Sequence, residues 1–489
     1  MANVVIIGAG VSGLAAGIYA QMRGHNAIIC EKHFRSGGNL TGWQRGDYHI
    51  DNCIHWLTGT NKKSATYNTW VELGALGDGV EVYQGESLYT CALGRESISL
   101  YRDIERLKDG MLRISPRDRK ETERFIHAVK TVMDLSCGEG IKRYLTAPAL
   151  LYYHNMSTGE LSRRFRHPLL REFIVSIMGE YFGAIALIFV FATFCSGNGG
   201  LPRGGSVRMA ERMTARFIGL GGVLHLNREA VKIQLEGNSA TKVFFSDGSS
   251  IEGDYFVLTP DPKLIFGGLL ERKMPSALQN QYKSEEMHRF SSIHAAFACN
   301  MEKAPFTGDY IFRIPREKRA ILGYDHVVLR EFSHEPDFAP KGKSIIQAMV
   351  FCDEIIAQKY IDLQKDSEKY KVKKKEISVQ ITEMIESEFE SLRGKLECID
   401  VWTPATYKRY TGAEVGSYMS FILPKRKLPT RISPRIKGIK NVLLATQWQH
   451  APGGLPTAAG CGKRAVEEIV RLEGRVARKS ENTGKAYAE

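Results

Sequence analysis

The first residues of the chain have the types and spacing needed to hold a nucleotide diphosphate. Gly8, Gly10 and Gly13 form a Gly-x-Gly-x-x-Gly turn directly after an apolar run, and Glu31 ends the next apolar run. In such a turn the first glycine permits a tight bend, and the second lets the backbone approach a pyrophosphate. The third lets the following helix pack on the sheet with its positive end toward the phosphates. Glu31 is placed to accept hydrogen bonds from a ribose, so the segment predicts a dinucleotide site.

A second glycine pair indicates which dinucleotide is bound. Lys32 opens a short segment that leads to Gly37, Gly38 and Asn39. A glycine pair here would let the backbone run close beside a cofactor that extends toward a second domain, which favours FAD over NAD. The alternative is an ordinary surface turn made by Ser-Gly-Gly.

A third glycine-rich turn lies near the end of the chain. An apolar strand is expected to end near Ala445, and Gly453-Gly454 follows. Pro456 suits the first turn of a helix that we expect to end near Glu473, with Gly474 as its C-terminal cap. The N-terminal end of this helix would stabilise negative charge on a reduced flavin ring. As pure structure, the same segment is an ordinary strand-to-helix crossover.

The elements that position these turns are predicted from the middle of the chain. Gly204-Gly205 opens a helix over residues 206–218, which ends in the glycine-rich residues 219–222. Strands are expected at 223–226, 230–233, 242–245 and 254–259, with a hairpin turn at 247–248. We expect the sheet of the first 31 residues to resume here. The glycines at 219–222 follow a helix rather than a strand, so no second nucleotide site, and hence no separate NAD(P)H site, is predicted.

Composition excludes several classes of protein. The 489 residues, with 43% hydrophobic and 25% charged, are typical of a globular protein of two or three domains. The N-terminus lacks a signal-peptide pattern, so a cytoplasmic location is expected. The longest apolar run, residues 184–192, is shorter than the roughly 18 residues that cross a bilayer, and predicts a buried or interfacial segment. The nine cysteines include no Cys-x-x-Cys pair and are interpreted as reduced packing residues, with no metal site.

The formal charge of +13 indicates either an anionic partner or a basic surface exposed to solvent. Basic residues concentrate in four places: residues 163–166, 365–375, 425–440 (including Arg431) and the C-terminal tail. No nucleic-acid recognition motif accompanies them, so nucleic acid is not expected as a partner. An anionic membrane surface is the better functional interpretation, which would make the protein a peripheral membrane protein. Plain solvated surface remains the alternative for each cluster.

Four segments together resemble the phytoene desaturase and retinol saturase group of FAD-dependent oxidoreductases. They are the fingerprint through Gly38, the segment Gly200-Leu-Pro-Arg-Gly-Gly-Ser206, Thr403-Pro404 with Thr406, and residues 448–462. The segment Asp51-Asn-Cys-Ile-His55-Trp-Leu is most similar to the saturase branch. Asn39 stands where many relatives carry a basic residue, and Thr446-Gln447 stands where Gly-Asp is common.

The resemblance implies an α/β fold with a Rossmann-like FAD-binding domain assembled from discontinuous segments and an inserted α+β substrate domain. We assign residues 1–79, 197–266 and 427–474 to the FAD domain, 80–196 and 267–426 to the substrate domain, and 475–489 to a polar tail. Helices are expected over 107–133 and 144–193, and strands over 303–351. Ile377, Ile381, Met384, Ile385 and Leu392 mark an amphipathic helix whose apolar stripe is interpreted as core packing.

The resemblance also implies hydride transfer between flavin N5 and a carbon of an isoprenoid, polyene or other lipid-like substrate, as desaturation, saturation or isomerisation. The electron partner would be a quinone, oxygen or a carrier protein. His55 is a candidate proton donor, although packing is the more ordinary role for such a histidine, and His450 is a second candidate by position. Val231 is expected to flank the adenine. The residues expected to bind FAD are Gly8, Gly10, Val11, Ser12, Gly13, Glu31, Lys32, Gly37, Gly38, Asn39, Val231, Gln447, Gly453, Gly454, Leu455 and Pro456.

Two other functions share parts of this pattern. A flavin amine oxidase would need a lysine near flavin N5 and an aromatic pair, for which Trp448 and Tyr418 are available, but the sequence places no lysine clearly. A non-catalytic protein of the prenylated-GTPase escort kind needs no flavin and would tolerate loss of the glycines and Glu31, which are intact here.

Overall fold

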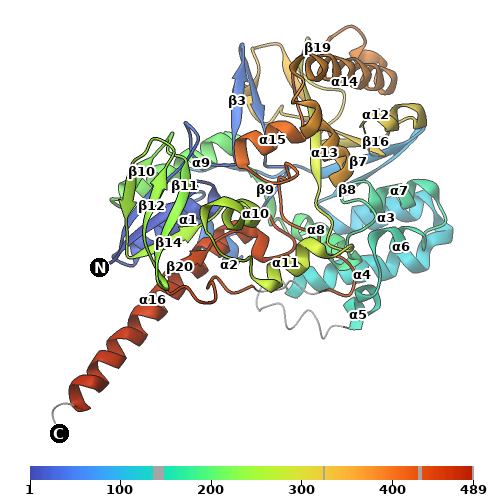
Figure 1. The fold of residues 1–489 in the computed structure, drawn as a ribbon. Coiled ribbons are helices and arrows are strands. Elements are labelled where there is room, and N and C mark those ends of the chain that lie inside the picture. The colour runs from blue at the N-terminus through green and yellow to red at the C-terminus, as the bar shows by residue number, and fades with distance from the viewer. Residues whose placement is uncertain (136–147, 323–324, 428–431, 487–489) are drawn as a thin grey trace.

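Five short strands from three distant parts of the chain form a parallel sheet in one half of the molecule (Figure 1). The computed structural model describes residues 1–135, 148–322, 325–427 and 432–486. All neighbours in the sheet pair in parallel, and strands from residues 223–258 join those of the first 31 residues, as expected. The strands, in spatial order, are β10 (Val223–His225), β2 (Asn26–Cys30), β1 (Asn3–Ile7), β14 (Tyr255–Leu258) and β20 (Val442–Leu444).

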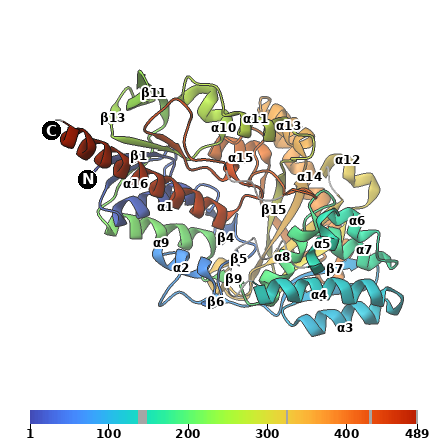
Figure 2. The same ribbon diagram turned by 90° about the horizontal axis from the view of Figure 1, so that it is seen from below.

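The central strand β1 has no polar side and is covered on both faces. Val4 and Ile6 pack against helices on one face, whereas Val5 and Ile7 pack against a second, antiparallel sheet on the other. This alternation follows from the two-residue repeat of a strand. The helices are α1 (Val11–Met22), α2 (Ala65–Glu72), α9 (Gly205–Gly219) and α16 (Leu455–Ala486), and Figure 2 shows α9, α1 and α16 side by side. The covering sheet consists of β11 (Ala230–Glu236), β12 (Ser239–Phe245) and β13 (Ser250–Glu252).

The other half of the molecule is built around a seven-stranded mixed sheet. Its strands, in spatial order, are β19 (Leu396–Trp402), β15 (Ser291–Cys299), β18 (Ser344–Cys352), β17 (His326–Glu331), β16 (Asp309–Arg313), β7 (Ser87–Leu93) and β8 (Glu96–Tyr101). One part of this sheet packs on α13 (Glu354–Leu363) and α14 (Ser367–Glu388). The predicted stripe Ile377, Ile381, Met384 and Ile385 lies in this core, which confirms its structural role.

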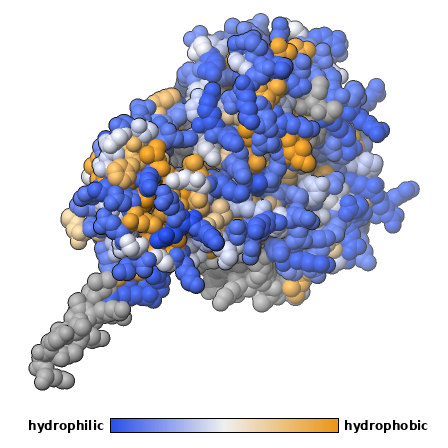
Figure 3. Space-filling model, viewed as in Figure 1, coloured by the Kyte–Doolittle hydropathy of each residue, from blue (hydrophilic) through white to orange (hydrophobic). Residues whose placement is uncertain are grey.

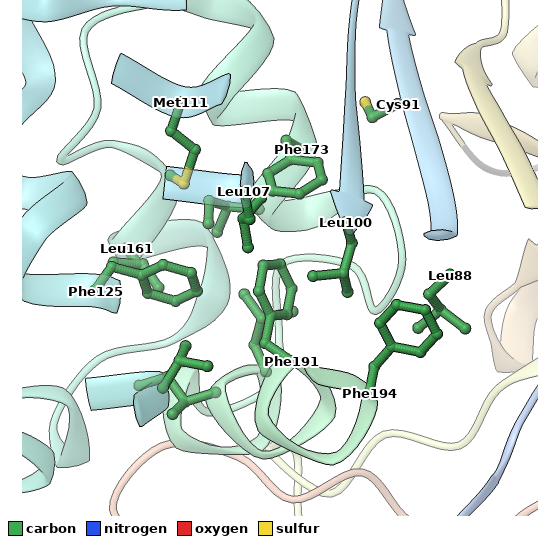
Figure 4. Packing of buried hydrophobic residues seen from close by; sticks show 14 of the residues in the cluster. Leu88, Cys91, Leu100, Leu107, Met111, Phe125, Leu161, Phe173, Phe191 and Phe194 are labelled. Carbon is green, nitrogen blue, oxygen red and sulfur yellow. The ribbon is translucent and has the colours of Figure 1, made fainter. Parts of the chain in front are cut away.

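A layer of helices packs on the β7 and β8 end of the same sheet. Phe125, Phe173 and Phe191 meet edge to face at its centre, next to Leu107 and Leu161 (Figure 4). The layer confirms the helices expected over 107–133 and after residue 147; residues 144–147 lie outside the described part of the chain. Its helices are α3 (Ile104–Ile114), α4 (Arg119–Leu135), α5 (Pro148–His154), α6 (Thr158–Ser162), α7 (Pro168–Val175) and α8 (Ala184–Cys195).

Shorter elements connect the two halves. The hairpin β3 (Gly42–Arg45) and β4 (Tyr48–Asp51) leads to a small sheet of β5 (Leu57–Thr58), β9 (Gly199–Pro202) and β6 (Val82–Tyr83). Helix α15 (Pro404–Thr411) follows β19, and α10 (Pro262–Leu264), α11 (Ser276–Lys283) and α12 (Arg319–Leu322) complete the set. The predicted turn at Gly248 is present, with a left-handed φ of 82°, but it joins β12 to β13, a strand that was not predicted, whereas β14 belongs to the parallel sheet.

The prediction for the last helix was wrong about its end. Gly474 does not cap α16, which continues to Ala486 and projects from the body of the molecule (Figure 1). A glycine inside a helix costs only about 1 kcal/mol relative to alanine, and no proline follows to stop the helix.

Candidate functional site

A cavity of about 790 Å³ begins at the C-terminal ends of the parallel strands and extends to the seven-stranded sheet. Ile7 and Cys30 end two of the parallel strands in its wall, and Val328 and Met349 belong to the other sheet. Open parallel sheets bind their ligands at this edge. The volume is in the range of small-molecule and cofactor sites.

The glycines of the first turn shape the start of the cavity in different ways. A Cβ on Gly13 would lie 1.9 Å from the carbonyl oxygen of Gly8, so Gly13 permits helix α1 to touch the turn. A Cβ on Gly10 would have no neighbour closer than 4.0 Å, and Gly10 lines the cavity. Gly37 has a φ of 112°, and its amide donates to the Ala9 carbonyl at 2.8 Å, which brings the second glycine pair beside the first turn. The open space at Gly10 is therefore available to a ligand.

Two helices begin at the cavity wall. Helix α1 starts at Val11 without a side-chain cap, and Val11 and Ser12 line the cavity. Helix α16 starts at Leu455, which also lines the cavity, and crosses α1 so closely that a Cβ on Gly462 would lie 2.3 Å from the Ser12 carbonyl oxygen. The N-terminal end of a helix favours negative charge, as on a pyrophosphate or a reduced flavin.

Glu31 is buried beside the first turn. Its carboxylate accepts hydrogen bonds from the Ala9 amide at 2.7 Å and the His33 amide at 2.9 Å. Burial raises the pKa of Glu31, and the two amides oppose that rise. The carboxylate is thus fixed in orientation at the cavity wall, where a ribose hydroxyl can donate to it.

The far part of the cavity is apolar. Helix α8 presents Ile185, Ala186, Phe189 and Val190 to it, which are residues one helical turn apart. Phe290, Met349, Phe351, Tyr153, Met178 and Phe182 line the same region. The apolar run at 184–192, expected to be buried or interfacial, thus has two distinct faces. One face of α8 packs in the helical core, and the other lines the cavity.

His55 also lines the cavity, from the segment between β4 and β5. Its Nδ1 is 3.0 Å from Oδ2 of Asp309, which also lines the cavity. Burial and the nearby Arg330 cation lower the pKa of His55, while Asp309 opposes that shift. The loop that carries His55 is tied to α9, because Ser206 donates from its amide and hydroxyl to Asp51 at 2.6 and 2.7 Å.

The apolar part ends at a basic rim made by Lys425, Arg426 and Lys427. Lys425 pairs with Glu160 at 2.5 Å and Lys427 with Glu286 at 3.6 Å. Arg426 is exposed, and no described residue pairs with its guanidinium. Arg431, predicted as part of this cluster, lies outside the described residues.

Most of the predicted residues meet at this cavity. Val231 does not: its side chain is 45% exposed, and Ala230 lines the cavity in its place. The ladder between β11 and β12 has a bulge between Ala230 and Lys232, which turns Val231 outward. The predicted residues that line the cavity are Gly8, Gly10, Val11, Ser12, Glu31, Lys32, Gly37, Gly38, Asn39, His55, Gln447, Gly453, Gly454 and Leu455.

Three other predicted residues do not line the cavity. Gly13 and Pro456 are not in the lining. His450 is buried, its Nε2 is hydrogen-bonded to Arg464, and its carbonyl accepts from Ser420 at 2.7 Å. The position of His450 next to the glycine pair in sequence was therefore misleading, because the chain turns between Gln447 and Gly453.

The two aromatic residues available for an amine-oxidising site both line the cavity but pack in different aromatic groups. Trp448 packs against Tyr282 and Phe421, whereas Tyr418 packs against Phe351 and Tyr407. Among the described residues, the lysines in the lining are Lys32, beside Glu31, and the rim residues Lys425 and Lys427. No lysine of the described chain lines the apolar part near His55.

Several important residues were missed by the sequence analysis. Asp309 and Arg330 lie in strands without any motif, and the cavity face of α8 was hidden in a uniformly apolar run. The available signal was that Asp309 and Arg330 are charged residues within segments that otherwise resemble buried, apolar strands.

Within the described residues, no helix combines the length and apolarity needed to cross a bilayer. The face seen in Figure 3 is mostly hydrophilic, with smaller hydrophobic patches. The cysteines of the described chain are free, and most are buried.

Comparison with known proteins relates the chain to flavoenzymes. A family model described as flavin containing amine oxidoreductase matches residues 11–470. A 4,4'-diapophytoene desaturase of Methylomonas sp. is 20% identical over 93% of this chain and 92% of its own. A chloroplastic prolycopene isomerase of Daucus carota is 22% identical over 85% of this chain and 71% of its own.

Solved structures share the fold. An oxidoreductase from Methanosarcina mazei superimposes with a TM-score of 0.62 at 14% identity, covering 96% of this chain and all of the other. A putrescine oxidase gives the same TM-score and identity, covering 96% and 99%. The mixed helix and sheet fold is thus that of FAD-dependent amine oxidase-like proteins.

Proposed function

Because the chain belongs to the family of flavin-containing amine oxidoreductases, we propose that it uses FAD to act on carbon–carbon bonds of a hydrophobic isoprenoid or polyene. The continuity of the cavity is the observation that carries this proposal. One end has the glycine turns, the two helix N-termini and Glu31. The other end is a channel of aromatic and aliphatic side chains without a charged residue from α8. When bound, FAD supplies the two-electron chemistry at its ring.

The protein's own residues hold the two molecules against each other. We assign FAD to residues 1–79, 197–266 and 427–474, a Rossmann-like unit, and the substrate to the inserted residues 80–196 and 267–426. Gly10 and the start of α1 would bind the pyrophosphate, Glu31 would bind the ribose, and Ala230, which lines the cavity, would flank the adenine. The start of α16, with Gly453 and Gly454, would face the ring. An external partner, a quinone, oxygen or a carrier protein, exchanges electrons with the site.

The direction of the reaction is read by mass spectrometry. We expect purified, yellow protein to convert a polyene or isoprenoid in a lipid extract, with oxidised and reduced enzyme incubated in parallel. A loss of two mass units identifies a desaturase, a gain of two a saturase, and an unchanged mass with altered retention an isomerase. A peroxide-coupled assay with aliphatic amines is the control. Turnover of amines without change in any polyene would contradict the proposal, and protein that takes up no FAD would favour an escort-like binding protein.

We further propose that the basic rim of the cavity contacts an anionic membrane surface, so that an apolar substrate enters from the bilayer. Lys425, Arg426 and Lys427 place positive charge at the end of the apolar channel. Each cation near an anionic surface contributes about 1 kcal/mol. A cytoplasmic protein of this kind would be peripheral to the membrane.

Charge reversal at the rim tests this contact by vesicle flotation. We expect Arg426→Glu to reduce binding to phosphatidylserine vesicles by about tenfold or more, because it removes one attraction and adds one repulsion. The control is Lys371→Glu on α14, where Lys371 already pairs with Glu368 at 2.8 Å. Binding of the wild-type protein should weaken as salt is added. Equal binding to neutral vesicles, or an equal effect of both variants, would reject the contact.

A further inference from the structure

Three side chains from distant segments form a chain of contacts at the cavity wall. His55 precedes β5, Asp309 begins β16, and Arg330 lies in β17. The Nδ1 atom of His55 is 3.0 Å from Asp309 Oδ2, and Arg330 Nε donates to Asp309 Oδ1 at 3.2 Å. The side chains become more buried along this chain, with exposed fractions of 20%, 14% and 6%. The histidine thus faces the cavity and the arginine faces the protein interior.

The sheet register fixes this arrangement. Asp309 and Arg330 are direct cross-strand partners in the antiparallel pair of β16 and β17. The other end of the Arg330 guanidinium donates from Nη2 to the carbonyl oxygen of Ile54 at 2.6 Å. Arg330 therefore fixes the Asp309 carboxylate, which contacts the His55 imidazole. It also fixes the backbone at Ile54, the residue before His55. A planar guanidinium can hold two acceptors in a fixed relation, which lysine cannot.

This geometry selects one tautomer of His55. An ionised carboxylate can only accept, so Nδ1 must carry the proton in the hydrogen bond to Asp309. In the neutral imidazole, Nε2 then has a free lone pair. Among the described residues Nε2 has no hydrogen-bond partner, and His55 lines the cavity.

We propose that Asp309 and Arg330 are positioning residues that hold His55 as the proton-transfer group of the cavity, with Nε2 toward the substrate. The inference rests on the proposed function. In the desaturating direction, one substrate carbon gives a hydride, with both electrons of its C–H bond, to FAD. The neighbouring carbon gives a proton to Nε2, and the electrons of that C–H bond form the C=C bond. The substrate is oxidised, FAD is reduced, and Asp309 balances the imidazolium charge. Saturation is the reverse, with the proton leaving Nε2.

The charges around His55 make the two positioning residues distinguishable. Asp309 of β16 and Asp51 of β4 raise the pKa of His55, whereas Arg330 and burial lower it. His294 of β15 also faces His55, and its pKa lies well below the ordinary value because of burial. His334 lies near the same carboxylates, and burial lowers its pKa to about 4. Both neighbouring histidines are therefore neutral near pH 7, and Asp309 and Arg330 act on His55 with opposite sign.

The tautomer is tested by NMR of protein labelled with ¹⁵N-histidine, without substrate and with FAD bound. His55→Gln assigns the resonance. We expect the wild-type signal to show a protonated Nδ1 and an unprotonated Nε2 at pH 7.5. Asp309→Asn should lower the pKa of His55, because it removes an anion. Arg330→Met should raise it, because it removes a cation. The control is Asp362→Asn, on an exposed carboxylate of α13 that pairs with Lys365 at 2.8 Å.

Turnover provides a second measurement. We expect Asp309→Asn to lower kcat by about 100-fold with a small change in KM, which is within the range of general acid–base effects. In Asp309→Asn, the acid limb of the plot of desaturation rate against pH should move to lower pH, because the pKa of His55 falls. In Arg330→Met, the same limb should move to higher pH. Arg330→Lys keeps the positive charge and should retain more activity than Arg330→Met. If Arg330→Met folds poorly, Arg330→Lys can be measured in its place.

Opposite pKa shifts and the Nδ1–H tautomer would support the inference. A protonated Nε2 in the wild-type protein, shifts of one sign, or full activity of Asp309→Asn would overturn it. Failure of the proposed function would be recognised separately, because the protein would then bind no FAD or convert no polyene, whatever the NMR result.

Discussion

Replacing Gly10 with alanine is expected to abolish tight FAD binding while the fold remains intact. A Cβ at this position would meet only Gly37 and Gly38 backbone atoms at 4.0 Å, which is ordinary contact. The backbone of Gly10 has a φ of −69°, which alanine adopts without strain. The new methyl group would instead enter the open space in the cavity that we propose for the pyrophosphate, beside the start of α1. We expect at least about a 100-fold loss of affinity, or about 2.7 kcal/mol.

The measurement is FAD titration of the apo protein by calorimetry, together with the melting temperature of the apo form. The melting temperature should be unchanged or slightly higher, because alanine restricts the unfolded chain. The matched control is Gly110→Ala in α3, where a Cβ would meet nothing within 4 Å and which lies outside the cavity lining. If Gly10→Ala bound FAD as tightly as Gly110→Ala, the pyrophosphate would have to lie elsewhere.

Replacing Ala186 with tryptophan is expected to close the apolar channel to long substrates. Ala186 is partly exposed on α8 and lines the cavity near Phe182 and Phe290. An indole there would occupy space that we expect a polyene chain to need, on an element that carries none of the residues proposed to bind FAD. We expect conversion of a long polyene to fall by about 100-fold, with an unchanged flavin spectrum. Ala186→Val should give an intermediate loss.

Leu187→Met is the control for the integrity of α8. Leu187 points into the helical core instead of the cavity, and methionine has a similar volume, so activity should be retained. Product formation is followed by chromatography on substrates of graded length. Equal loss for short and long substrates would point to damage of the fold, and no loss for either would place the substrate outside this channel.

Local sequence determined the nucleotide turn, because each glycine there satisfies a requirement set by near neighbours. Gly13 must be small to clear the Gly8 carbonyl, five residues earlier, and Glu31 accepts from the amide of Ala9. The strands on both sides of the turn were equally predictable as strands, because strands covered on both faces are continuously apolar. The apolar stripe of α14 followed from its helical spacing.

Predictions for individual residues were wrong where the position of a side chain, or the end of a helix, depends on contacts outside the local sequence segment. A bulge in the β11–β12 ladder turned Val231 to the solvent, and strand pattern alone does not reveal a bulge. His450 was assigned by its distance in sequence from the glycine pair, but its side chain meets Arg464 of α16. The end of α16 was placed at Gly474, where the surrounding helix formers outweigh a single glycine.

The sequence by itself determined that this chain carries a glycine-rich turn typical of dinucleotide sites and resembles FAD-dependent oxidoreductases, because each of the motifs concerned is made of residues close together in the chain. Only the tertiary structure decided what surrounds the reacting part of the cavity. His55, Asp309 and Arg330 are separated by more than 250 residues at the extremes, and strand register alone brings Asp309 opposite Arg330. Such pairings depend on which strands become neighbours, and no spacing within a segment encodes them.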